Sequence, residues 1–226
     1  MKMKDRTRYI ACMGMFTALA FLAVVLTEWI PKVNGFLSYE PKDAIIVIAG
    51  FIFGPMSCLI LSILVPLIEF LTISSTGPWG FLMNAVASCA FTVPAAWIYS
   101  KKRTLGGAVI GLTVGMVFMT GCMLVWNYIV TPYYMSMGPV TEVAAKRKIV
   151  GGMLASVFLP FNLIKGGMNA GLAMLLYKPV VSALRGAHLV APSKGKKGKF
   201  NLGFTLFALA VLTTFLLLFL VKIGKI

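Results

Sequence analysis

Long apolar runs separated by short polar stretches dominate this 226-residue chain. The runs cover about residues 9–30, 44–73, 81–99, 106–130, 149–177 and 202–221. A helix that spans a bilayer needs about 20 mainly apolar residues, so each run is long enough for a span. The pattern therefore predicts an all-α integral membrane protein.

The apolar run 44–73 contains a break at Gly54-Pro55. The run is too long for one helix and too short for two full spans, and a glycine followed by a proline interrupts a helix. We expect a short helix that ends near Phe53 and a second helix after the break.

These elements divide the chain into three predicted parts. Residues 1–184 form a six-helix membrane domain, 185–201 a basic cytoplasmic linker, and 202–226 an additional transmembrane helix with its tail. Because the last helix is uniformly apolar and poor in small or polar residues, we interpret it as a peripheral anchor. A polar loop is expected before residue 149.

The composition excludes a soluble enzyme. Hydrophobic residues make up 59% of the chain and charged residues 12%, and the mean hydropathy is +0.92, so no soluble nucleotide-binding domain fits beside the helices. The segment SKGKKGK at 193–199 lacks the spacing of a phosphate-binding loop. If ATP drives this protein, another subunit hydrolyses it.

Basic residues outnumber acidic ones by 21 to 6 and gather near the N-terminus, at 101–103 and in the linker. Six crossings place these three clusters on one side, and the positive-inside rule makes that side the cytoplasm. The basic residues at 146–148 and at 222 and 225 fall on the other side. We predict a multi-pass protein of the cell membrane, with the lipid bilayer as its environment, a cytoplasmic N-terminus and no nucleic-acid partner.

The cysteines and the histidine favour neither a metal site nor catalysis. The four cysteines are far apart within apolar segments and show no CxxC spacing, and His188 has no metal-ligand neighbour. No Ser/His/Asp grouping falls within a span. We expect no catalytic residues, no metal and no cofactor.

The stretch FLPFNLIKG at 158–166 places polar residues inside an apolar run. Asn162, Lys165 and Asn169 are spaced i, i+3 and i+7, so they share one helix face. Contacts with neighbouring helices, or a lysine reaching for the membrane surface, would also explain them. Because Lys165 lies mid-span, where a charge is costly, we favour a binding role.

Other spans supply residues suited to the same pocket. Asn127 lies between Trp126 and Tyr128 in VWNYIV, Asn84 lies in the fourth helix, and Trp79 precedes it. Aromatic residues at span ends are equally explained by the interfacial belt. Together these amides, the lysine and the aromatic rings suit a planar molecule that forms hydrogen bonds.

Glu69 is the only carboxylate deep in an apolar run. It either pairs with Lys165 or is kept protonated by burial. In the first helix, Gly14 and Ala18 form a small-xxx-small pair that allows another helix to approach closely. Packing within the bundle and an interface with a partner remain open for this pair.

Three strings in this order, FIFGP (51–55), WNYIVTPYY (126–134) and FLPFNLIKG, resemble the riboflavin-specific S components of energy-coupling factor (ECF) transporters. The similarity covers about residues 10–178. The resemblance implies a six-helix S-component bundle that binds the vitamin near the extracellular side. It also implies a shared membrane coupling subunit and two cytoplasmic ATPases as partners.

The resemblance assigns Asn127, Asn162 and Lys165 to the flavin site and Gly14 and Ala18 to the coupling-subunit interface. Riboflavin would be the transported ligand, not a cofactor.

The sequence also departs from these relatives. They usually have an Asp-Phe-Ser-Asp-like stretch where this chain has residues 40–43, a Lys-Asn pair at 65–66, an amide at Glu69 and an aliphatic residue at Asn169. An S component for another vitamin or a nucleobase-like solute therefore remains an alternative. A stand-alone proton-coupled carrier with Glu69 and Lys165 as its titrating pair is a second alternative, and no internal inverted repeat supports it.

Overall fold

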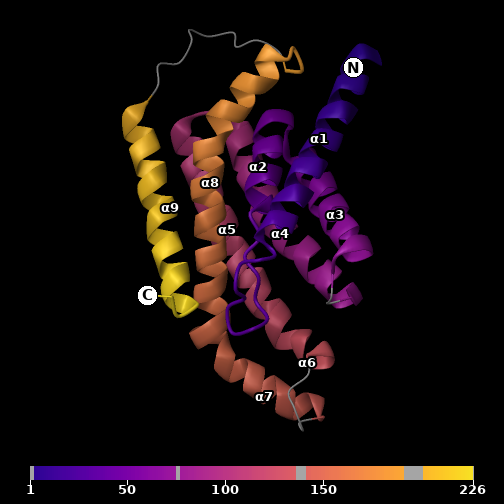
Figure 1. Cartoon of the computed structure of the whole chain (residues 1–226), viewed down its shortest axis with the longest axis vertical. Coiled ribbons are helices and arrows are strands. Elements are labelled where there is room, and N and C mark those ends of the chain that lie inside the picture. Colours follow the sequence, from indigo (N-terminus) through magenta and orange to yellow (C-terminus); the bar gives the residue numbers. More distant parts are fainter. Residues whose placement is uncertain (1–2, 75–76, 136–140, 191–200, 226) are drawn as a thin grey trace.

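The computed structural model describes residues 3–74, 77–135, 141–190 and 201–225, and these ranges are mainly helical (Figure 1). The helices are α1 (Met3–Thr27), α2 (Lys42–Phe53), α3 (Pro55–Thr72), α4 (Gly77–Lys101), α5 (Leu105–Ile129), α6 (Thr131–Tyr134), α7 (Val143–Met153), α8 (Leu159–Gly186) and α9 (Leu202–Lys222). A π-helical segment, Leu154–Phe158, joins α7 to α8.

Six helical stretches in the described ranges are long and apolar enough to cross a membrane. They lie in α1, α3, α4 and α5, in the continuous stretch from α7 to α8, and in α9. The all-α membrane class is therefore confirmed, and α9 is one of the six. The short helix α2 has 12 residues and does not reach the length of a span.

The break between α2 and α3 lies where the sequence predicted it. Gly54 has φ of 101°, a conformation that favours glycine, and Pro55 occupies the first turn of α3. Close packing also requires Gly50, because a Cβ there would lie 2.0 Å from the sulfur of Cys58. These features place α2 in the middle of the bundle, against α1, α3, α4 and α8.

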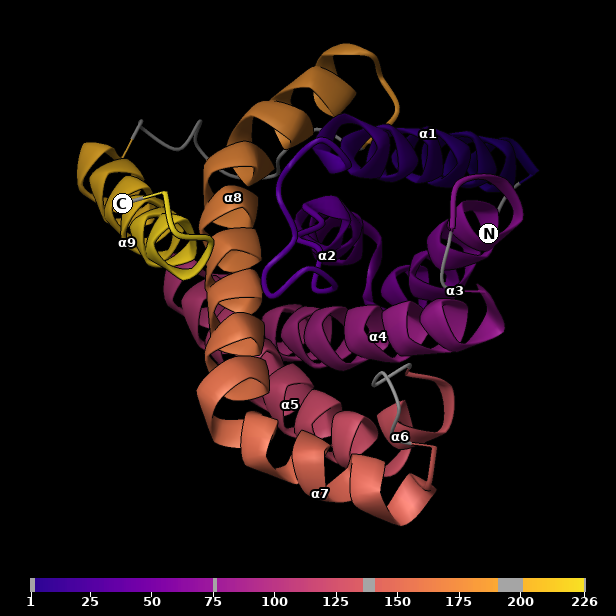
Figure 2. The same cartoon turned by 60° about the horizontal axis from the view of Figure 1, so that its bottom comes forward.

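The predicted polar loop before residue 149 is wrong, because α7 occupies residues 143–153. The segment VAAKRK consists mainly of good helix formers, and Val150 on the same helix is fully buried, so propensity and packing both favour a helix. Figure 2 shows α7 turning away from α8 at the π-helical segment. The basic residues of α7 therefore lie across the end of the bundle and not along a span.

Pro160 accounts for part of the irregularity at this turn. Proline has no N–H to donate to the carbonyl four residues earlier, which is that of Ser156. Lys222 Nζ, near the end of α9, donates to this oxygen at 2.8 Å.

Helix α9 packs along the outside of α8 (Figure 1). Gly167 and Gly171 make the close approach possible, because a Cβ would lie 2.3 Å from the ring of Phe215 at the first position and 2.9 Å from Leu212 Cβ at the second. Ala208 and Phe219 are buried, whereas most other α9 side chains are exposed. The helix is thus peripheral but closely fitted to its neighbour on one face.

Different helix ends and connections lie at the two ends of the bundle. The start of α1, the connection between α4 and α5, and the end of α8 lie at the upper end in Figure 1. The connection between α1 and α2, together with α6, α7 and the end of α9, lies at the lower end.

Candidate functional site

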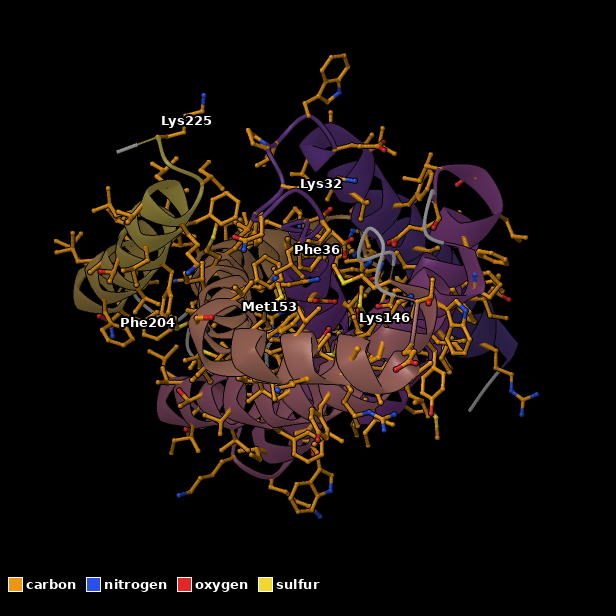
Figure 3. All side chains as sticks on the ribbon, turned by 90° about the horizontal axis from the view of Figure 1, so that it is seen from below. Lys32, Phe36, Lys146, Met153, Phe204 and Lys225 are labelled. Carbon is orange, nitrogen blue, oxygen red and sulfur yellow. The ribbon has the colours of Figure 1, made fainter. Side chains whose placement is uncertain are left out.

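A cavity opens at the lower end of the bundle, beneath the connection between α1 and α2. It encloses about 1110 Å³, including the part open to solvent. Its wall is formed by the end of α1, residues 28–40 of the connection, and facing turns of α3, α4, α5 and α8. Figure 3 looks onto this end, where Phe36 of the connection and Met153 of α7 pack against the same buried apolar cluster.

Five of the residues predicted for the site line this one cavity. They are Glu69 of α3, Asn84 of α4, Asn127 of α5, and Asn162 and Lys165 of α8. Four different helices are therefore needed to assemble the polar part of the wall.

The amides of Asn127 and Asn162 are oriented by hydrogen bonds to residues four positions away along the chain. Asn127 Nδ2 donates to the carbonyl of Met123 at 2.7 Å, and its Oδ1 accepts from Thr131 Oγ1 at 2.9 Å. Asn162 Nδ2 donates to the carbonyl of Phe158 at 2.8 Å. Because a side-chain amide has two N–H groups, each residue has a second donor for a molecule in the cavity.

Asn169 shares the helix face of Lys165 but does not line the cavity. Its Nδ2 donates to the backbone carbonyls of Glu40 (3.2 Å) and Lys165 (3.1 Å), and its Oδ1 accepts from the backbone N–H of Ala44 at 3.1 Å. The side chain thus holds the start of α2 and the residue before Pro41 against α8.

The three aromatic residues predicted to contact a ligand also lie outside the cavity lining. Trp79 stacks on Tyr134 with ring centroids 5.8 Å apart. Trp126 packs against the core, its indole Nε1 buried with no hydrogen-bond partner among the described residues, and Tyr128 is exposed. The rings that do line the cavity belong to Phe36, Tyr39, Phe70, Phe81 and Phe161.

The cavity wall carries a buried ionic network that sequence analysis missed. Lys42 is fully buried, and its Nζ lies 2.7 Å from Glu40 Oε2 and 2.7 and 2.9 Å from the two carboxylate oxygens of Glu69. Lys165 Nζ lies 3.3 Å from Glu40 Oε2. Pairing with Lys165 was one of the two states expected for Glu69, and this pair is not formed, because Glu69 pairs with Lys42 and Lys165 pairs with Glu40.

Asn84 joins the two carboxylates from the side of α4. Its Nδ2 donates to Glu40 Oε1 at 3.4 Å and to Glu69 Oε2 at 3.3 Å. Burial alone would raise the pKa of Glu40, but the ammonium groups of Lys165 and Lys42 outweigh it and lower that pKa to about 2. Glu40 is therefore a carboxylate at neutral pH.

Glu40 and Lys42 lie in a stretch that sequence analysis treated as a loop and a departure from relatives. A signal existed in the segment YEPKD, where two acids and a lysine surround a proline next to an apolar helix. Their burial, however, depends on the connection folding back into the bundle, which no local pattern predicts.

Together these features define a class of protein. It is a membrane-embedded helical bundle with a cavity for a small molecule, and the cavity wall is partly aromatic and partly polar. Among the described residues, no group of three or more His, Cys, Asp or Glu side chains is arranged to hold a metal ion. The arrangement is suited to binding and orienting a molecule by ring contacts and a few hydrogen bonds.

Residues 8–177 match the family model of the substrate-specific component of ECF transporters, and the chain belongs to this family. It is therefore a multi-pass membrane protein and a non-enzymatic transport subunit of the kind that pairs with an ECF energising module. The matched region ends before the linker and α9.

Similar proteins with assigned functions are riboflavin transporters. The chain is 28% identical to the riboflavin transporter RibU of Staphylococcus aureus over 82% of this chain and 96% of the relative. It is 24% identical to the riboflavin transporter FmnP of Bacillus subtilis over 81% of this chain and 99% of the relative.

A solved structure described as the S component of a bacterial ECF transporter superposes with a TM-score of 0.65 at 25% identity, covering 80% of this chain and 99% of that one. The S-component fold is thereby confirmed.

Proposed function

We propose that this protein is the riboflavin-binding subunit of an ECF importer. The observation that carries the proposal is the meeting of Asn127, Asn162 and Lys165 in one cavity, in a chain whose relatives over about 80% of its length are riboflavin transporters. These residues come from two different helices, so their meeting is a property of the fold and not of one motif.

The chemistry of the wall suits a flavin. The isoalloxazine ring is flat and apolar on its faces, and phenylalanine rings such as Phe70, Phe81 and Phe161 provide apolar contact surface. The ring edge and the ribityl chain carry carbonyl, N–H and hydroxyl groups that match amides, a lysine and carboxylates. Lys165 has three N–H donors, so its contact with Glu40 leaves donors for a ligand oxygen.

The proposed partners are a membrane coupling subunit and two cytoplasmic ATPases. Gly14 and Ala18 support α1 as the contact surface, because both are exposed and a Cβ added at Gly14 would meet no atom within 4 Å. A second helix can therefore approach α1 closely at this position.

We further propose that residues 1–184 act as the binding unit, with a cytoplasmic N-terminus and a cavity that opens to the outside. The basic residues near the start of α1 and at 101–103 lie at the end of the bundle opposite the cavity (Figure 1), which supports this orientation.

The test is flavin binding by the purified protein. Protein from cells grown with riboflavin is expected to be yellow, and the ligand-free protein should quench riboflavin fluorescence on titration. Lys165→Ala should weaken binding by about 10- to 100-fold, the range for losing a hydrogen bond to a charged group. Lys178→Ala, further along the same helix and outside the cavity lining, is the matched control. A colourless protein that causes no quenching contradicts the proposal.

The buried network favours one alternative ligand class, because Glu40, Lys42 and Glu69 differ from the residues usual in riboflavin-specific relatives. A panel of vitamins and nucleobases in a thermal-shift assay separates the two possibilities, since a ligand that binds the folded state raises its melting temperature. The proton-coupled carrier has less support, because its proposed titrating pair is not formed.

A further inference from the structure

Among the described residues, the cavity wall offers two largely buried carboxylates, and its buried cations all contact carboxylates. Glu40 and Glu69 line it directly. The two buried ammonium groups that the structure describes here, on Lys42 and Lys165, already contact those carboxylates at 2.7–3.3 Å.

The cavity lining also carries more acidic than basic side chains. Its lining contains three carboxylates, on Glu28, Glu40 and Glu69, against two ammonium groups, on Lys32 and Lys165. Lys32 is exposed at the mouth. Behind the wall, the buried residues Lys42 and Asp43 add one basic and one acidic side chain.

We propose that Glu40 and Glu69 determine specificity by accepting hydrogen bonds from the hydroxyl groups of an unphosphorylated ligand and excluding its phosphate ester. This inference rests on the proposed function. It adds that the site prefers riboflavin to flavin mononucleotide, the phosphate ester of riboflavin. A hydroxyl group donates to a carboxylate in a short, charge-assisted bond.

A phosphate monoester cannot replace the hydroxyl in this role. It carries a charge of about −1.5 to −2 at pH 7 and offers mainly acceptor oxygens. Beside two carboxylates it meets repulsion, which water screens little in a partly buried site. The ammonium group of Lys165 could still donate to a phosphate oxygen, but its charge is already balanced by Glu40 at 3.3 Å, so the phosphate would share this cation with a carboxylate.

Glu69 is the residue on which the inference can be tested without removing the network. In Glu69→Gln the side chain keeps its shape, while Lys42 keeps Glu40 as an ionic partner 2.7 Å away. The substitution therefore removes one negative charge from the wall. The matched control is Glu142→Gln, which removes the same charge from an exposed residue at the start of α7.

The experiment is a fluorescence-quenching titration of the purified protein with riboflavin and with flavin mononucleotide at low and physiological salt. The wild-type protein is expected to bind riboflavin at least about 100-fold more tightly, since like-charge contacts and unpaired polar groups discriminate strongly between ligands. Glu69→Gln should reduce that ratio about tenfold, and Glu142→Gln should leave it unchanged.

The outcomes separate this inference from the proposed function. Absence of riboflavin binding contradicts the proposed function itself. Binding of riboflavin with equal binding of its phosphate overturns the inference alone, and this comparison needs only the wild-type protein. An unchanged ratio in a folded Glu69→Gln protein overturns the role assigned to Glu69.

Discussion

Removing the ammonium group of Lys42 is the sharpest perturbation of the fold, because this side chain is fully buried between two carboxylates. Lys42→Met keeps a flexible apolar stem of similar length but leaves Glu69 without its cation. Glu40 retains Lys165 at 3.3 Å, so Glu69 bears most of the loss.

The expected cost follows from the contact distances. Two unit charges about 3 Å apart attract by about 5 kcal/mol at an effective dielectric constant of about 20. Breaking a buried pair by removing one partner typically costs about 3–5 kcal/mol, because the remaining charge stays buried. For a protein of this size, that loss corresponds to a fall of about 6–20 °C in melting temperature.

Thermal unfolding of the ligand-free protein in detergent measures this effect. Lys32→Met, an exposed lysine in the same connection, is the matched control and should change the melting temperature by no more than about 2 °C. The double variant Lys42→Met/Glu69→Gln should recover most of the lost stability, because it removes the unpaired charge as well. A Lys42→Met protein as stable as the control would refute the interpretation of Lys42 as a buried ionic partner.

Two further predictions concern pH and the contact between α8 and α9. Because the pKa of Glu40 is lowered from 4.5 to about 2, its contribution to stability is present above pH about 4.5 and is lost as the pH falls toward 2; unfolding at stepped pH should show this loss. A melting temperature that is constant from pH 5 to pH 3 would contradict it. Gly167→Leu should lower stability by about 1–3 kcal/mol, because the added side chain overlaps the ring of Phe215, whereas Gly121→Leu, where a Cβ meets no atom within 4 Å, should not. Equal melting curves for the two leucine variants would show that α9 is not fitted closely to α8.

The spans and the break at Gly54-Pro55 could be predicted because they depend on local sequence alone. Apolar length determines which segments cross a membrane, and Gly54 needs a backbone conformation that other residues avoid. Helix α7 was missed for the opposite reason. Its polar composition indicates a surface segment, but only contacts with the bundle, such as that of the buried Val150, decide that the segment is helical.

The candidate site was predictable in its amides and in Lys165, because polar residues inside apolar runs must have partners. The identity of those partners was not predictable. Glu40 and Lys42 reach the cavity through a connection whose path is set by tertiary contacts, including those of Asn169 with the backbone of Glu40 and Ala44. Helix spacing correctly placed Asn169 on the face of Lys165. It does not reveal that Lys165 lines the cavity while Asn169, one turn later, is packed against the start of α2.

The fit of α9 on Gly167 and Gly171 also affects which other helices can bind this protein. Because α9 belongs to the same chain, its binding to this face is intramolecular, and an outside helix competes with it at a disadvantage. A membrane partner that sought the glycine face of α8 would have to displace α9 first, whereas at Gly14 on α1 it would meet no such competitor among the described residues. Helix α9 thus covers the glycine face of α8, whereas the face of α1 at Gly14 stays accessible to a partner helix.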